Sequence, residues 1–573
     1  MTARAPPDAS LRLEWIFGYN GVAMKNVHFL AKNIIVYFTA GVGVVFRLAE
    51  KDQKYFHGHN DDITSLAVSP DKTKVATGQL GDEPYICVWH PFTLETLSVL
   101  KDAHLIGIKR LGFSLDGKML ASLGMDDSNT LVVWDWQRGT SVASTTGHSA
   151  RVLDLTWSPY TANELATCGD HHLRLWHQLG NSFKSHGAVF GAADLVQNLT
   201  CVLYQSETTL VTGTEHGHVY VWRNRELYRV IDGTHDSAVL CLALARDGLV
   251  TGGEDGHVKL WTAHYDPSKT VRARSPALNR DGAVTSVVWE HGQFLIGTRL
   301  SEIFVHHDAD SVCYMQGHGK GELWGLCPHV ANYLVVTAGE DHTVRVWDVE
   351  KREALQATRL DLEVMACAVR PDSSQIAVGM KYGTVAILRS GDMSEVTRIS
   401  DRKEAISDLK FSPDGSRLAV GSHDNFVDVY ETERYRRKAE LAGASSYISH
   451  LDWSMHGDYV QLNSGAGERL VFAAHDGSRV TDQDVLDSLE WHTLTGVLGP
   501  EIHGIWPRYS DLTDINTADV DVENGVIATG DDFGLVKLFR YPCRKKGENY
   551  DIGDTPFPKE MPAGRHGCQL ISL

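Results

Sequence analysis

Metal binding is the first chemistry that the sequence invites, because the chain has 28 histidines. Adjacent histidine pairs occur twice, at His171-His172 and His306-His307. Successive strand residues point to opposite faces, so neither pair can reach one ion from a regular strand. His57 and His59 could share a face, but only turn aspartates follow them. Metal sites need three or four convergent ligands, so the sequence predicts no metal site.

Catalysis is the second chemistry to test. The string GHGKGE (317–322) contains Gly and Lys, but a phosphate-binding loop needs GxxxxGK followed by Ser or Thr. No GxSxG string provides a serine nucleophile, and no cysteine lies in a nucleophile motif. Acidic pairs lie in turns, where solvated charge is a simpler interpretation than glycosidase chemistry: Asp61-Asp62, Asp126-Asp127 and Asp531-Asp532. We therefore expect a protein that is not an enzyme and has no cofactor.

The charge balance limits the partners. The chain has 573 residues, with 54 Lys+Arg against 73 Asp+Glu and a formal net charge of −19. Nucleic acids and anionic membranes both attract basic surfaces, so we expect neither as a partner. No apolar run reaches the roughly 18 residues of a membrane span. The nine cysteines are scattered without a CxxC pair, and the first ten residues lack the apolar core of a signal peptide. These features predict a cytoplasmic protein with free thiols.

A strand pattern that ends in an aromatic residue recurs about every forty to forty-five residues. Degenerate copies extend the series to twelve closing residues: Phe46, Trp89, Trp134, Trp176, Trp222, Trp261, His306, Trp347, Leu388, Tyr430, Phe472 and Phe539. Within a copy, alternating strands are separated by turns such as SPDKT and SPDGS, where Asp and Gly tolerate the required backbone angles. Each copy predicts three or four antiparallel strands, which is one propeller blade.

The copies resemble the WD-repeat family. Gly-His precedes a copy at Gly58-His59, Gly147-His148 and Gly317-His318, and an aspartate stands six residues before the closing residue at Asp170, Asp255, Asp341 and Asp424. The resemblance implies a buried hydrogen-bonded set of His, Asp and Trp, which we assign to His318, Asp341 and Trp347. We interpret the closing tryptophans as packing between blades rather than as ligand platforms, because each has the same place in the repeat.

Twelve copies exceed the four to eight blades of an ordinary ring. The predicted fold class is therefore all-β, with tandem WD-repeat β-propellers of about seven and six blades, the last one incomplete. The predicted domains are an N-terminal segment (1–21), a first propeller (22–310) and a second propeller (311–573). Residues 266–282 are either a linker or a loop within a blade. The strand-like residues 490–496 are expected to complete the blade that precedes them.

Residues 11–21 do not follow the blade pattern. Five bulky apolar residues alternate with other residues, which predicts a strand with one buried face: Leu11, Leu13, Trp15, Phe17 and Tyr19. The segment resembles the second half of the HELP motif of the echinoderm microtubule-associated protein-like family. The string HGHNDDITSLAVSPDKTKVATGQLG (57–81) resembles the first propeller of that family, and WHTLTGVLGPEIHGIWPRYSDLTDIN (491–516) resembles its second. The resemblance covers nearly the whole chain.

The family resemblance implies a propeller pair that binds tubulin. The expected function is a non-catalytic, microtubule-associated scaffold of the cytoplasm and cytoskeleton, in a spindle or a cilium. The alternative is a ciliary or signalling adaptor that uses its propeller faces without binding tubulin. Family members carry a coiled coil and a basic linker, and neither precedes Leu11 here, so we expect weak, salt-sensitive microtubule binding. The sequence assigns no partner-binding residues and no oligomeric state.

Small basic clusters could contact acidic tubulin, although solvated surface is the simpler interpretation: Arg434, Arg436, Arg437 and Lys438; Arg544, Lys545 and Lys546; Arg272 and Arg274. At the C-terminal end of the sequence, residues 563–573 lie where a last blade would begin. We expect either that the natural protein continues beyond Leu573 or that the N-terminal segment completes the ring.

Overall fold

The computed structural model describes residues 5–191, 195–246, 248–329, 333–507, 515–532 and 534–552. These residues form twelve antiparallel sheets, and eleven of the sheets have four strands. The chain divides into two compact units. Within the described residues, the first unit comprises residues 16–319 and the second comprises residues 5–15 and 320–552. The predicted domain ranges 1–21, 22–310 and 311–573 stay predictions, because compactness alone does not show which parts fold independently.

The first unit contains seven sheets, each made of four consecutive strands. The strands are β1 (His28–Ala31), β2 (Ile34–Thr39), β3 (Val42–Arg47), β4 (Asp52–Phe56), β5 (Ile63–Val68), β6 (Val75–Gln79), β7 (Ile86–Trp89), β8 (Thr96–Leu100), β9 (Ile108–Phe113), β10 (Met119–Gly124), β11 (Leu131–Asp135), β12 (Thr140–Thr145), β13 (Val152–Trp157), β14 (Glu164–Gly169), β15 (His172–Leu179), β16 (Ser182–Gly187), β17 (Leu199–Tyr204), β18 (Thr209–Thr214), β19 (Val219–Arg223), β20 (Glu226–Ile231), β21 (Val239–Ala245), β22 (Gly248–Gly253), β23 (His257–Thr262), β24 (Pro267–Arg272), β25 (Val284–Glu290), β26 (Gln293–Thr298), β27 (Glu302–His307) and β28 (Asp310–Met315).

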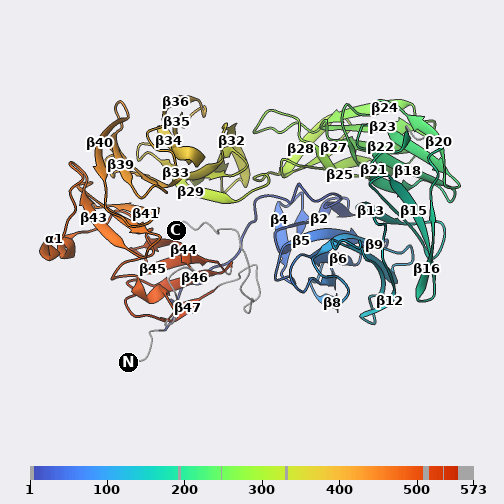
Figure 1. Ribbon diagram of the computed structural model, residues 1–573, viewed down its shortest axis with the longest axis horizontal. Coiled ribbons are helices and arrows are strands. Elements are labelled where there is room, and N and C mark those ends of the chain that lie inside the picture. Colours follow the sequence, from blue (N-terminus) through green and yellow to red (C-terminus); the bar gives the residue numbers. More distant parts are fainter. Residues whose placement is uncertain are drawn as a thin grey trace. The chain divides into compact units, whose positions relative to one another are not determined.

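These seven sheets form a closed ring, blue to green in Figure 1. The first strand of each sheet packs against the first strand of the next, from β5 through β9, β13, β17 and β21 to β25. Strand β1 packs against β25, so the first sheet meets the seventh. This arrangement is a seven-bladed β-propeller whose first strands face the centre. Residues 266–282 are not a linker, because β24 and the following loop belong to the sixth blade.

The second unit contains five sheets within the described residues, four with four strands and one with three. The strands are β29 (Leu323–His329), β30 (Leu334–Gly339), β31 (Thr343–Asp348), β32 (Glu353–Arg359), β33 (Val364–Val369), β34 (Gln375–Met380), β35 (Val385–Arg389), β36 (Glu395–Ile399), β37 (Ile406–Phe411), β38 (Arg417–Ser422), β39 (Val427–Glu431), β40 (Arg436–Leu441), β41 (Ile448–Trp453), β42 (Tyr459–Ser464), β43 (Arg469–Ala473), β44 (Ile515–Asp521), β45 (Val526–Asp531), β46 (Val536–Arg540) and β47 (Tyr550–Asp551). Three short helices accompany them: η2 (Lys381–Gly383), α1 (Gln483–Ser488) and η3 (His503–Ile505).

The second unit repeats the blade plan of the first. Strands β29, β33, β37 and β41 pack in succession, and the Nε2 atom of His450 in β41 lies 3.0 Å from the carbonyl oxygen of Asn516 in β44. The described residues contain five sheets where about six blades were predicted. The expected start of a last blade at residues 563–573 lies outside the described residues.

Residues 490–496 pack against the blade that precedes them but add no strand to it. They were expected, as a strand-like segment, to complete the blade of β41–β43. Trp491 instead bridges Ser454, directly after the inner strand β41, and His492 N donates to the carbonyl of Trp453. Among the described residues, a short return of the chain lies along the outer edge of β43, where Phe472 bridges Arg479. The insertion therefore packs against the inner strand, and this sheet has three strands.

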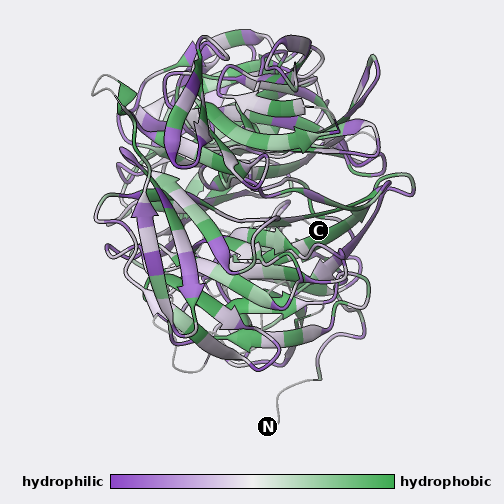
Figure 2. Cartoon of the chain, turned by 90° about the vertical axis from the view of Figure 1, so that its right-hand side faces the viewer, coloured by the Kyte–Doolittle hydropathy of each residue, from purple (hydrophilic) through white to green (hydrophobic). Residues whose placement is uncertain are grey.

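Apolar residues concentrate on the strands, as the green segments in Figure 2 show. The twelve predicted closing residues all lie on the third strand of a sheet, and eleven of them are aromatic or aliphatic side chains packed between blades. The prediction of an all-β fold with tandem propellers is confirmed. Within the described residues, no helix is long and apolar enough to cross a membrane.

Candidate functional site

A hydrogen-bonded chain of four side chains closes the sixth blade of the first unit. Nδ1 of His235 donates to Asp255 at 3.0 Å, and Nε2 lies 2.8 Å from Oγ1 of Thr251. The Thr251 oxygen in turn accepts from Nε1 of Trp261 at 3.0 Å. These residues come from the loop before β21, from β22, from the turn before β23 and from β23 itself. These hydrogen bonds therefore connect the loop before the blade to its second and third strands.

The charge of Asp255 is stabilised by this arrangement. Burial alone would raise the pKa of Asp255, but the hydrogen bond and the charge of His235, together with the backbone N–H groups of His257 and Asp236, outweigh it. The resulting pKa is about 2. The carboxylate thus stays ionised at neutral pH and accepts the hydrogen bond from His235. Its role is structural.

Two other blades carry the part of this arrangement in which one hydroxyl joins a His to a Trp. His59 contacts Gln79 at 2.8 Å and Thr77 at 2.7 Å, and Trp89 donates to the same Thr77 oxygen at 3.1 Å. His104 and Trp134 share the hydroxyl of Ser122 in the third blade, at 2.7 and 2.8 Å. The sequence interpretation missed the hydroxyl that joins His to Trp in every case. A Thr or Ser on the strand before the closing tryptophan was the available signal.

The predicted set is divided between the two units, since His318 belongs to the first and Asp341 and Trp347 belong to the second. Asp341 accepts from the hydroxyl and the N–H of Thr343, at 2.7 and 2.9 Å. Trp347 donates to Thr337 at 2.6 Å, as the tryptophans of the first unit do. The assignment of these three residues to one buried set stays a prediction.

His148 does not take the role that its Gly-His motif suggested. Its ring stacks on His172, with centroids 3.8 Å apart, and its Nδ1 atom accepts from the N–H of Ala150. Trp176 of the same blade donates to Thr167 instead. Burial lowers the pKa of both histidines, to about 4 for His172. The stack is therefore neutral at pH 7.

Residues 5–15 form the first part of an N-terminal strap, which we define as residues 5–27. This part packs within the second unit. Leu11 contacts the apolar cluster of Val526, Ala528 and Leu538 on the last sheet. The guanidinium of Arg352, in the turn between β31 and β32, lies 4.7 Å from the ring centre of Trp15. The segment thus joins the last described sheet of the second unit to its first.

Exposure in this part of the strap follows the predicted alternation but does not produce a strand. Leu11 and Leu13 are half-buried, whereas Arg12 and Glu14 are exposed. Glu14 pairs with Arg352 at 3.1 Å. Residues 11–21 form no strand. The prediction of a strand here is wrong, because side-chain contacts hold the segment in place of a backbone ladder.

Residues 16–21 form the next part of the strap and lie within the first unit. Tyr19 is 2% exposed, and its ring meets Tyr37 edge-on with centroids 6.1 Å apart. A Cβ on Gly297 of the seventh sheet would lie 2.3 Å from the Tyr19 hydroxyl. Gly18 has a φ of +101°, and its Cα would lie 2.3 Å from a Cβ on Gly317. A Cβ at Gly297 or at Gly317 would clash with the strap, so both of these positions need glycine. Phe17, beside them, is half-buried.

Lys25 carries the strap into the centre of the first ring. Its Nζ atom lies 2.6 Å from Oδ2 of Asp154 on β13, whose side chain is fully buried. Asp154 also accepts from the N–H of Val202 on β17 at 2.9 Å, and Arg110 of β9 lies 3.4 Å away. The N–H of Lys25 donates to Thr285 of the seventh blade. Lys25 therefore connects the seventh blade, through its backbone, to the fourth blade, through its side chain.

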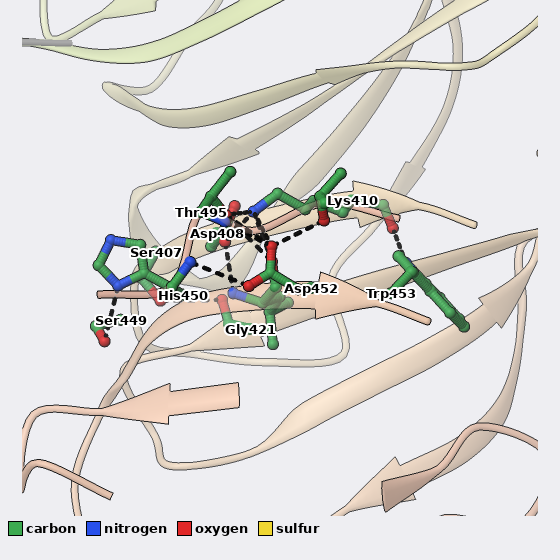
Figure 3. A network of polar contacts seen from close by, with 12 residues as sticks. Ser407, Asp408, Lys410, Gly421, Ser449, His450, Asp452, Trp453 and Thr495 are labelled. Atoms are coloured by element: carbon green, nitrogen blue, oxygen red, sulfur yellow. Dashed lines mark hydrogen bonds and ion pairs between the residues drawn. The ribbon is translucent and has the colours of Figure 1, made fainter. Parts of the chain in front are cut away.

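A second polar network lies among the inner strands of the second unit (Figure 3). Lys410 of β37 donates to Thr495 and to the carbonyl of Leu451, and its Nζ atom lies 3.1 Å from Asp408. Asp452 of β41 accepts from the backbone N–H groups of Thr495 and Gly496 at 2.9 and 3.0 Å. The network thus fixes the insertion after residue 490 against two blades.

This network contains a lysine, two aspartates and a histidine, which are residue types of an acid–base site, but the contacts among them are those of a structural network. Burial alone would lower the pKa of Lys410, but Asp408 and Asp452 outweigh it and raise the pKa. Burial lowers the pKa of His450. Each charge is therefore matched by a partner that belongs to the fold. Among the described residues, no group of three or more His, Cys, Asp or Glu side chains could hold a metal ion.

Several of the predicted basic residues pair with acidic neighbours. Arg437 lies 3.4 Å from Asp428, and Lys438 lies 2.8 Å from Glu431. Arg544 pairs with Glu501 at 3.2 Å, and Arg274 with Asp281 at 3.9 Å. Because these cations are partly neutralised within the chain, they offer a partner less charge than the sequence suggested.

Family models match three parts of the chain. Residues 6–44 match the HELP motif, residues 52–306 match the first β-propeller of echinoderm microtubule-associated protein, and residues 323–554 match its second β-propeller. The HELP match contains most of the strap together with the first two strands and the start of the third. The two propeller matches fall within the two units.

Curated relatives are similar over nearly the whole chain. The 77 kDa echinoderm microtubule-associated protein of Strongylocentrotus purpuratus is 31% identical over 95% of this chain and 81% of its own length. Echinoderm microtubule-associated protein-like 2 of Homo sapiens is 34% identical over 94% of this chain and 85% of its own length. Echinoderm microtubule-associated protein-like 1 of Rattus norvegicus is 32% identical over 94% of this chain and 68% of its own length. With its HELP segment and both propellers, the chain belongs to the echinoderm microtubule-associated protein-like family.

Proposed function

We propose that this protein is a non-catalytic, microtubule-associated scaffold that binds tubulin through its propellers and modulates microtubule organisation. The observation that carries the proposal is the similarity to proteins named for microtubule association, which extends through the HELP segment and both propellers. Its place of action would be the microtubule cytoskeleton of the cytoplasm. The polar clusters around Asp255 and Lys410 support a structural role for their own residues, because the charged groups in them pair with one another.

Exposed apolar side chains on the first ring allow a test of which face binds. Leu105 and Ile106 are 77% and 52% exposed and lie in the loop before β9. Leu115 is 59% exposed and follows the same strand. The two ends of a propeller strand lie on opposite faces of the ring, so these residues report on different faces. We assign tubulin contact to the face with Leu105 and Ile106, because two adjacent apolar groups remove more surface from water than one.

The experiment uses the full chain with stabilised microtubules and with soluble tubulin. Sedimentation at low and moderate salt measures lattice binding, and gel filtration measures binding to soluble tubulin. We expect comigration with soluble tubulin and weak, salt-sensitive pelleting. The double variant Leu105→Asp/Ile106→Asp should weaken comigration about tenfold or more, whereas Leu115→Asp, the matched control, should not.

The two arms give separate answers. Association that survives both aspartate variants would reject the assigned face and leave tubulin binding standing. No association of the parent chain with either form of tubulin would reject tubulin binding altogether. The alternative adaptor function, in which the propeller faces bind other proteins, would then be the better hypothesis.

A further inference from the structure

Two cysteines of the second unit lie in direct contact without forming a disulfide. Cys327 lies on β29 and Cys367 on β33, the inner strands of the first two sheets of that unit (Figure 1). Their sulfur atoms are 3.4 Å apart, and both residues are free thiols. A disulfide needs about 2.0 Å between sulfurs. A disulfide between Cys327 and Cys367 therefore requires the two sulfurs to approach each other by about 1.4 Å.

The strand geometry explains why these thiols meet. Cys367 points back toward the preceding sheet, since its sulfur lies 3.8 Å from the carbonyl oxygen of Val336 on β30. A Cβ on Gly325 of β29 would lie only 2.9 Å from the Cys367 sulfur. The missing side chain at Gly325 thus makes room for Cys367 beside β29. Cys327 stands two residues further along that strand, on the same side, and faces Cys367.

A second pair of cysteines has the same spacing but a different orientation. Cys201 and Cys241 are also forty residues apart in sequence, as the positions 201 and 241 show, and lie on the adjacent inner strands β17 and β21 of the first unit. The Cys201 sulfur lies 3.6 Å from the carbonyl oxygen of Val239, on the next blade. The Cys241 sulfur lies 3.5 Å from that of Val284, also on the next blade. Both thiols point the same way around the ring, so spacing alone does not make a pair.

We propose that Cys327 and Cys367 are a modification site, at which hydrogen peroxide or a related peroxide forms an intramolecular disulfide between the first two blades of the second unit. Cys327 is the partly exposed thiol and Cys367 is 9% exposed, so the peroxide reaches Cys327 first. The neighbouring Cys327 thiol and burial both raise the pKa of Cys367, which disfavours its thiolate form.

The reaction balances in two steps. The Cys327 sulfur attacks one peroxide oxygen, the O–O bond breaks, and sulfenic acid and water form. The Cys367 sulfur then attacks the sulfenic sulfur, the S–S bond forms, and the S–OH group leaves as water with the Cys367 proton. Overall, two thiols and one hydrogen peroxide give one disulfide and two waters. The sulfurs lose two electrons and the peroxide gains them, and a dithiol reductant reverses the change.

The disulfide would constrain the second unit. It would close the chain between positions 327 and 367 and join β29 to β33 covalently. Cross-linking residues this far apart reduces the entropy of the unfolded chain and stabilises the fold, provided that the native geometry is not distorted. In a reducing compartment the bond would be transient and would report oxidising conditions.

The test treats the full chain with increasing hydrogen peroxide, blocks free thiols under denaturing conditions and maps peptides. We expect a reducible peptide linking Cys327 to Cys367, and a higher melting temperature of the second unit. Cys327→Ser should abolish both effects, and Cys201→Ser is the matched control that should retain them. Cys327→Ala serves as a second variant if the serine disturbs folding.

Peptide mapping of the parent chain decides the proposal without any variant. If peroxide converts exposed methionines to sulfoxides while Cys327 and Cys367 both stay free, the two thiols do not form this site. A linked peptide without a change in melting temperature would support the modification and reject the stabilising effect. The outcome is independent of tubulin binding.

Discussion

The Nζ atom of Lys25 lies 2.6 Å from the carboxylate of Asp154, which joins the segment before the first blade to the inner strand of the fourth. The lysine side chain is 28% exposed, whereas that of Asp154 is fully buried. In a ring of seven blades, the first and fourth blades are almost opposite, so the ion pair crosses the centre. It therefore stabilises the ring as a whole rather than one contact between neighbours.

Replacing Lys25 should destabilise the first unit. The variant Lys25→Met leaves Asp154 buried with only Arg110 and the N–H of Val202 as partners. We expect a loss of about 2–4 kcal/mol in the free energy of unfolding, because one partner of a buried pair is removed. Urea unfolding followed by fluorescence measures the change. Lys118→Met is the control, since its pair with Asp116 is exposed and should contribute less than about 0.5 kcal/mol.

The double variant Lys25→Met/Asp154→Asn tests the mechanism. If the cost comes from an unpaired buried carboxylate, removing that charge as well should recover part of the stability. A double variant as unstable as the sum of the two single variants would contradict the ion-pair explanation.

Mild acid should weaken the first unit through its buried histidines. Burial lowers the pKa of His59 to about 4, and the hydrogen bond that His59 donates to the Gln79 Oε1 atom acts in the opposite direction. The folded state therefore prefers the neutral ring, and its contribution to stability is present above about pH 6.5 and is lost as the pH falls toward 4. His59→Gln should remove up to about 3 kcal/mol of this acid dependence.

Urea unfolding at intervals between pH 7 and pH 4 measures this effect. Replacement of the exposed His216 is the matched control and should leave the pH profile as in the parent chain. A His59→Gln profile that is parallel to that of the parent would show that protonation of His59 is not coupled to unfolding.

The strap should affect the two units separately. Tyr19→Ala removes a buried ring from the seam of the first unit and should cost about 3–5 kcal/mol there. Trp15→Ala removes a half-buried ring from the second unit and should cost about 1–2 kcal/mol. Hydrogen exchange should increase in β2 and β26 for the first variant and in the turn between β31 and β32 for the second. Equal increases in both units for either variant would contradict this division.

Repetition made much of the fold predictable from sequence. All twelve closing residues, from Phe46 to Phe539, lie on the third strand of a sheet, because the period and the alternation survive even where the tryptophan is replaced. His235 was missed because Thr234 stands where glycine was expected. Its partner Thr251 was missed because a lone hydroxyl on an apolar strand has no distinctive pattern.

Contacts between distant parts of the chain were not predictable. Lys25 and Asp154 are 129 residues apart, and nothing in either local sequence indicates the other. Of the five alternating residues, Tyr19 is buried, whereas Leu11, Leu13, Trp15 and Phe17 are half-buried. The alternation could not show that the first three lie in one unit and the last two in the other. These contacts form only when the blades close into a ring, so the sequence of a single repeat does not indicate them.

The position of the strap also sets an order of events during synthesis. Tyr19 and Lys25 leave the ribosome before any blade exists, yet their partners include Asp154, Thr285 and Gly297. Chains fold progressively from the N-terminus as they emerge. The strap of the first ring must therefore wait, unpaired, until the seventh blade has been translated.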